Sequence, residues 1–167
     1  GRSGLAGAVA AHERLAWRAA AVLVVLLGAT FRFGGIGWDV PDGTDVPLQM
    51  HPDERFISIV NEKIEWPRSP GGYFDTSNST LNPYNQAETP SFVYGTFPVF
   101  LAKSLATAAG SEVPLVNSLA GRVCERDGYD STVLCGRRLT ALTDTLTIVL
   151  VIALGVVLLG RGGALVA

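Results

Sequence analysis

An acidic pair at the start of a predicted surface helix is the part of the sequence best suited to chemistry. Asp53 and Glu54 follow His51 and Pro52, and proline favours the first turn of a helix. The free N–H groups and the dipole of a first turn favour negative charge, so we expect both carboxylates to be ionised. Ionised carboxylates suit a proton acceptor or a metal ligand better than a proton donor. Acidic residues at helix starts are also common for stability alone, and that interpretation stays open.

Two residues near the pair are weaker candidates. His51 could be a metal ligand, which makes a divalent metal a possible cofactor; no cofactor is certain. His51, Asp53 and Glu54 lie too close together, without a second cluster, to complete a coordination sphere. Asp39 lies upstream in a turn-rich acidic segment and either lines the same site or only forms a turn.

Two helices are expected in this part of the chain. Phe56, Val60 and Ile64 recur on one face, which predicts an amphipathic helix over residues 52–65. A second, apolar helix is expected over 90–109, beginning at Thr89-Pro90 and kinked at Pro98. We favour a position at the membrane surface for this second helix, although a third span remains open.

Composition places the chain in the membrane class. It is 48% apolar and only 17% charged, with a mean hydropathy of +0.31. The near balance of 13 basic and 15 acidic residues excludes the electrostatic footprint of a nucleic-acid-binding protein. Residues 19–31 carry no charge, and residues 139–159 carry only Asp144, which should face protein or water rather than lipid. The first stretch is short, so a signal peptide or a buried helix is an alternative to a span.

These features predict an all-α integral membrane protein whose two transmembrane helices flank a large extracytoplasmic loop with amphipathic interfacial helices. Arginines before the first span place the N-terminus in the cytoplasm, and the protein in the cytoplasmic membrane. The predicted segments are a cytoplasmic N-terminus (1–18), a first span (19–33), the external loop (34–138), a second span (139–160) and a cytoplasmic turn leading into a truncated next span (161–167).

The two cysteines lie within the predicted external loop. Cys124 and Cys135 flank a short turn, and outside the cell such a pair can close a small loop. Two free thiols are the alternative. A zinc site would need more ligands than this stretch contains.

The order of these features resembles the N-terminal part of a GT-C membrane glycosyltransferase. The chain is similar to glycosyltransferase family 39, the protein O-mannosyltransferase and aminoarabinose transferase group. It is closer to Chloroflexi-type phospholipid-carrier-dependent glycosyltransferases, and it extends from Phe31 to the end of the chain. We therefore expect the chain to be a piece of a larger protein with about ten or more spans, inactive by itself. The blocks that carry the resemblance are HPDERF, YFDTSNSTLNPYN, FVYGTFPVFLAK and GRRLTALTD.

The resemblance implies an enzyme that acts on the outer face of the cytoplasmic membrane. Its partners would be a polyprenyl-phosphate-linked sugar donor, a protein, lipid or glycan acceptor, and the bilayer. Asp53 occupies the place of the catalytic acidic residue, with Glu54 as a second carboxylate. A direct displacement at the anomeric carbon would invert that centre. The Lys-Pro-Pro often found before the second surface helix reads Glu88-Thr89-Pro90 here, so other cations would have to meet the donor phosphate. The candidates are Arg55, Lys103, Arg137 and Arg138.

Two other functions remain as alternatives. The chain could be a non-enzymatic receptor or structural protein whose spans hold an external ligand-binding domain. A metal-dependent hydrolase using His51, Asp53 and Glu54 is disfavoured by the close spacing of these ligands. Arg137 and Arg138 could also only anchor the start of a span at the headgroups.

Overall fold

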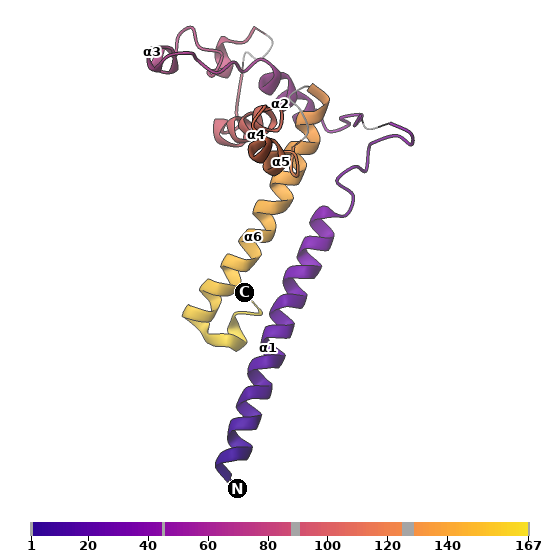
Figure 1. Cartoon of the computed structure of the whole chain (residues 1–167), viewed down its shortest axis with the longest axis vertical. Helices are drawn as coiled ribbons and strands as arrows, with labels where there is room; N and C mark the ends of the chain where they lie inside the picture. The colour runs from indigo at the N-terminus through magenta and orange to yellow at the C-terminus, as the bar shows by residue number, and fades with distance from the viewer. Residues whose placement is uncertain (1, 45, 88–90, 125–128, 167) are drawn as a thin grey trace. The chain divides into compact units, whose positions relative to one another are not determined.

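The computed structural model describes residues 2–44, 46–87, 91–124 and 129–166. Within these ranges the chain is helical, with no strand. It divides into two compact units: a spanning unit, Gly1–Ile36 with Thr140–Ala167, and a loop unit, Gly37–Leu139. The helices, labelled in part in Figure 1, are α1 (Arg2–Phe33), α2 (Pro52–Glu62), α3 (Pro70–Phe74), a 3₁₀ turn (Pro83–Asn85), α4 (Thr96–Ala109), α5 (Pro114–Ala120) and α6 (Tyr129–Gly163).

Two helices have the length and apolar composition needed to cross a membrane. These candidate spans are Val9–Phe33 in α1 and Thr132–Gly163 in α6. Almost none of either segment is buried within the structure, and large apolar side chains such as Leu27 and Leu154 are exposed along them. Exposed apolar surface of this extent suits contact with lipid. The prediction of a helical protein with two candidate membrane helices is therefore confirmed at this level.

Within the spanning unit, α1 and the second half of α6 run side by side in opposite directions (Figure 1). The indole Nε1 of Trp17 donates to the carbonyl of Arg161 at 2.7 Å. Asp144 pairs with Arg32 at 3.4 Å, while 51% of its side chain is exposed. At Gly28 an added Cβ would meet the terminal methyl of Ile148, so this side chain of α6 reaches the α1 backbone.

Both long helices extend beyond the predicted spans at their N-terminal ends. The first runs from Arg2 rather than residue 19, because the preceding segment is rich in alanine and contains no proline to stop it. The last begins at Tyr129, ten residues before the predicted start at 139. Hydropathy marks the part of a helix that suits lipid, whereas helical geometry continues through polar residues as well. At its far end α6 is interrupted at Gly160, whose φ of 72° is left-handed.

The loop unit has a core between α2 and α4. Val60 of α2 and Ile64, just beyond the end of that helix, pack with Val99 of α4, and each is at most 2% exposed. The Asn61 amide, fully buried, donates to the carbonyl of Val99 at 3.1 Å. The apolar faces of α2 and α4 therefore pack on each other. The core is completed by Leu81 and Phe92, with Phe56, Ile57, Tyr94 and Phe100 packed against it.

The bounds of these two helices differ from the prediction. The first ends at Glu62 with Lys63 as its C-cap, rather than at residue 65. The second begins at Thr96, whereas a start at residue 90 was expected; Thr89 and Pro90 themselves lie outside the described residues. Pro98 is thus in the first turn of α4, where a missing N–H leaves no hydrogen bond unmade, and it does not kink the helix interior as expected.

A second small core joins α4, α5 and the start of α6. Its buried members are Ala102, Ala109, Ala120, Cys124 and Cys135. These small side chains let the backbones approach closely, and the two cysteines form a disulfide. The short helix α5 was not predicted, because seven residues are too few to show a clear periodicity.

Candidate functional site

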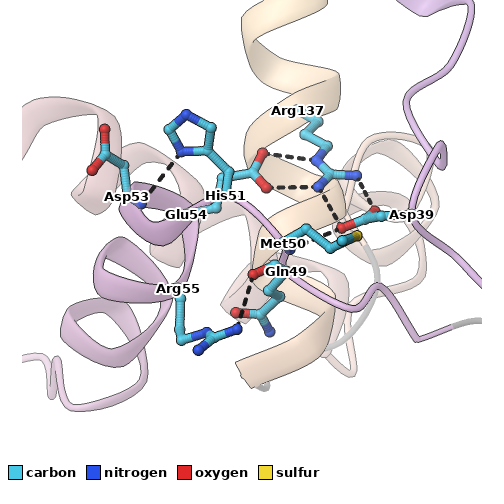
Figure 2. Close-up of polar contacts among 8 residues, drawn as sticks. All are labelled: Asp39, Gln49, Met50, His51, Asp53, Glu54, Arg55 and Arg137. Carbon is cyan, nitrogen blue, oxygen red and sulfur yellow. Dashed lines mark hydrogen bonds and ion pairs between the residues drawn. The ribbon is translucent and has the colours of Figure 1, made fainter.

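The start of α2 and the first part of α6 meet at a buried ion-pair cluster. Figure 2 shows the guanidinium of Arg137 between the carboxylates of Asp39 and Glu54. Nη1 and Nη2 donate to Asp39 at 2.7 and 3.1 Å. Nε and Nη2 donate to Glu54 at 2.8 and 2.6 Å. Both contacts are bidentate, the geometry in which an arginine binds a carboxylate most strongly.

Asp39 is the most deeply buried member of the cluster. Its side chain is 0% exposed, against 10% for Arg137 and 29% for Glu54. The hydrogen bonds from Arg137 lower the pKa of Asp39 below its ordinary value of 3.8, and the N–H of Met50 at 3.4 Å acts in the same direction, while burial opposes both. Asp39 is therefore a charged structural anchor here.

The segment after Asp39 folds back over it. The N–H of Leu48 donates to the Asp39 carbonyl at 3.1 Å, and Gln49 is buried with a φ of +50°. A left-handed conformation is uncommon outside glycine and marks a position that its surroundings hold in place. The Trp38 ring lies 5.7 Å from the Arg137 guanidinium carbon, within cation–π range. This loop thus connects Asp39 directly to the start of α2.

Asp53 lies in the same helical turn but in a different environment. His51 is the N-cap of α2, and its Nδ1 accepts the Asp53 N–H at 3.3 Å. The Asp53 side chain is exposed and points away from Arg137 (Figure 2). A capped, fixed backbone with an exposed carboxylate can accept a proton from a substrate hydroxyl, because the group is accessible and needs no rearrangement.

Tyr94 is a neighbour of Asp53 that the sequence did not indicate. A hydrogen bond with the Asp53 carboxylate raises the pKa of the Tyr94 hydroxyl, with smaller effects from burial and from the Asp53 charge. The Tyr94 ring packs on Phe56 and Phe92, with ring centres 6.1 and 5.8 Å apart. Phe56 lies three residues after Asp53 on α2, so this aromatic cluster lies beside the exposed carboxylate on the same helix face.

The remaining predicted site residues lie elsewhere in the loop unit. Arg55 is exposed and donates to the carbonyl of Gln49 at 3.4 Å. Lys103 is 7% exposed within α4. Arg138 donates to the carbonyl of Val123 at 3.3 Å. These contacts hold Arg55 and Arg138 against local backbone, and the structure brings together Asp39, Glu54 and Arg137.

No metal-binding cluster is found in the described ranges. Among those residues, no three or more His, Cys, Asp or Glu side chains are grouped so that they could hold a metal ion. The structure gives His51 the role of a helix cap. The contact of Asp39 with Arg137 was not predicted from the sequence. Arg137 lies at the predicted boundary of loop and span, and an arginine that is buried there needs carboxylate partners.

Comparison with known proteins adds no relative. No protein-family model matches the chain, and no curated protein and no solved structure is significantly similar to it.

Proposed function

We propose that this chain acts as part of a membrane glycosyltransferase, which moves a sugar from a polyprenyl-phosphate donor to an acceptor hydroxyl outside the cytoplasmic membrane, with inversion. The observation that carries this proposal is the exposed Asp53 carboxylate on a capped helix start. The loop unit that holds it is joined at both ends to helices apolar enough to cross a bilayer. A lipid-linked sugar stays at the bilayer, so its acceptor must be activated close to the surface.

Asp53 is the general base in this proposal. It removes the proton from the acceptor hydroxyl as the oxygen attacks the anomeric carbon, and the bond to the phosphate oxygen breaks. The departing phosphate carries the bonding electron pair and requires a cation. Arg55, which is exposed, and Arg138 are the better placed candidates for that contact, because Lys103 is 7% exposed within α4. Arg137 is reassigned to a positioning role, because its hydrogen bonds to Asp39 and Glu54 fix the turn that carries Asp53.

The test is the loss of sugar transfer on Asp53→Asn. Membranes containing the intact protein are incubated with polyprenyl-phosphate sugars and acceptors, and transfer is followed by labelled sugar. Glu62→Gln is the matched control, because Glu62 is an exposed acidic residue on the same helix. We expect Asp53→Asn to lower the rate by about 10²-fold or more, with Glu62→Gln unchanged and both proteins inserted normally. Retained transfer by Asp53→Asn, or no transfer by the wild type from any such donor, contradicts the proposal.

A non-enzymatic receptor is the second candidate, favoured by one observation. The loop unit is compact and has its own apolar cores, as an independent external domain would. The two functions differ in what residues 34–138 do without the spans. A soluble, cooperatively folding fragment supports the receptor. A fragment that aggregates or binds detergent supports the transferase, whose loop needs the bilayer and further helices.

A further inference from the structure

The short helix α5 carries a row of apolar side chains that are exposed among the residues the structure describes. Val113, Leu115, Val116 and Leu119 are 54%, 69%, 39% and 59% exposed. The segment 113–121 contains no charged residue, and Glu112 and Arg122 flank it. Exposed aliphatic residues concentrated on one short helix indicate a binding surface rather than the scattered apolar residues of an ordinary protein surface.

The packing of α5 fixes which of its faces is turned outward. Ala120 is buried in the small-residue core against α4 and α6. Asn117 donates from its amide to the carbonyl of Ala109 at 2.7 Å, at the end of α4. Leu115 and Leu119 are one turn apart and therefore share a face. Because α4 holds the opposite side, these leucines cannot turn inward without breaking the core.

Covalent and hydrogen-bonded links tie the end of α5 to the start of α6 within the loop unit. The N–H of Cys124 donates to the carbonyl of Ala120 at 2.9 Å, so the disulfide lies one turn beyond the end of α5. Its partner Cys135 is four residues before Leu139, where the long apolar stretch of α6 begins. Four helical residues rise about 6 Å, close to one turn. The disulfide that ties α5 to α6 therefore lies about one helical turn before the apolar stretch begins.

We propose that α5 is a membrane-docking helix, whose Val113, Leu115, Val116 and Leu119 side chains bind the lipid at the outer surface of the bilayer. Arg122 is exposed directly after α5 and is long enough to reach lipid headgroups while the helix is inserted. The helices α2 and α4, which the sequence predicts to lie at the membrane surface, pack apolar faces on each other within the loop unit. This inference is independent of the proposed transferase activity.

The test places a fluorescent label on α5 in the intact protein reconstituted into phosphatidylcholine–phosphatidylglycerol vesicles. Leu115→Cys and Leu119→Cys are labelled with an environment-sensitive maleimide dye, because both native cysteines are buried and paired with each other. Arg68→Cys, at an exposed polar position outside α5, is the matched control. Quenching is measured with spin-labelled lipids and, separately, with aqueous iodide. Both substituted leucines are exposed, so neither variant removes a core contact.

We expect spin-labelled lipid to remove most of the fluorescence at positions 115 and 119, and iodide to remove most of it at position 68. Quenching of the α5 labels by iodide alone would show that α5 faces water and would overturn the proposal. Protection from both quenchers would also overturn it, because the surface would then be covered by protein, either a second copy of the chain or another segment. Agreement between two neighbouring positions guards against an effect of the dye at one site.

Discussion

Replacement of Arg137 by methionine should destabilise the loop unit by about 3–5 kcal/mol, because it leaves a buried carboxylate without its counter-ion. Methionine keeps most of the length and packing of the side chain and removes the guanidinium. Asp39, 0% exposed, would then lose both hydrogen bonds from the guanidinium, while the 3.4 Å hydrogen bond from the Met50 N–H stays. Removal of one partner from a buried ion pair is costly in this way even where the intact pair contributes little.

Most of this loss belongs to Asp39 rather than to Glu54. The Glu54 carboxylate is 29% exposed and can be hydrated after the change, so its share should be about 1 kcal/mol. The double variant Asp39→Asn/Arg137→Met removes the stranded charge as well. It should therefore be more stable than Arg137→Met alone, by about 2 kcal/mol, although it carries one more substitution.

The measurement is chemical unfolding of the intact protein in detergent, followed by tryptophan fluorescence. Trp38 contacts the Arg137 guanidinium and reports directly on this site. The free energy of unfolding is compared for the wild type, Arg137→Met, Asp39→Asn and the double variant. A double variant as unstable as Arg137→Met, or less stable, would refute the reasoning, since the cost would then come from lost packing and not from the stranded carboxylate.

Two further predictions concern the same region. Acidification should weaken the fold: the pKa of Asp39 is lowered by folding, so its stabilisation is complete above its ordinary value of 3.8 and is lost as pH falls through the lowered value. Unfolding measured from pH 6 to pH 2 should show this loss in the wild type, and a flatter profile in Asp39→Asn; parallel profiles would contradict it. Replacement of both Cys124 and Cys135 by alanine should cost about 3 kcal/mol, from the closure of a loop with a sequence separation of 11. Thermal unfolding of this variant beside the wild type measures the cost, and an unchanged midpoint would show that the disulfide constrains little.

The helical architecture with two candidate membrane spans was predictable because it depends on local properties of the chain. A long run of apolar residues such as 139–159 requires a helix wherever it meets lipid, since every backbone polar group must be paired within the segment. Pro52 and the acidic pair after it likewise mark a helix start by their own chemistry. The structure has α2 beginning at Pro52, as expected.

Helix limits were less predictable because they depend on packing. Position 90 offered good local signals for a start, yet α4 begins at Thr96, where Val99 can reach the α2 core. The early start of α6 at Tyr129 is a similar case: Cys135 and its neighbours pack against α4 and α5, so helix forms well before the apolar stretch. Such contacts join residues far apart in sequence, and no short window contains them.

The site was partly predictable for the same reason. Asp53 and Glu54 were identified as a pair from helix-start preference, and Asp39 from turn chemistry. Arg137, the common partner of Glu54 and Asp39, lies 83 residues from the first and 98 from the second. Its role became visible only with the fold. Tyr94 was missed because one tyrosine among several aromatic residues gives no signal of its own.

The different environments of Asp53 and Glu54 follow from helix geometry. Consecutive residues of an α-helix point about 100° apart, so two adjacent carboxylates in one turn cannot share a partner without distortion. Once Glu54 is held by Arg137, Asp53 must face away from the cluster, toward Tyr94 and solvent. Breaking the Arg137 contact should therefore alter the orientation of Asp53 as well as the stability of the loop unit. If sugar transfer is detected, Arg137→Met should lower its rate even under conditions where the protein stays folded, whereas an unchanged rate would show that Asp53 is positioned by His51 and Tyr94 alone.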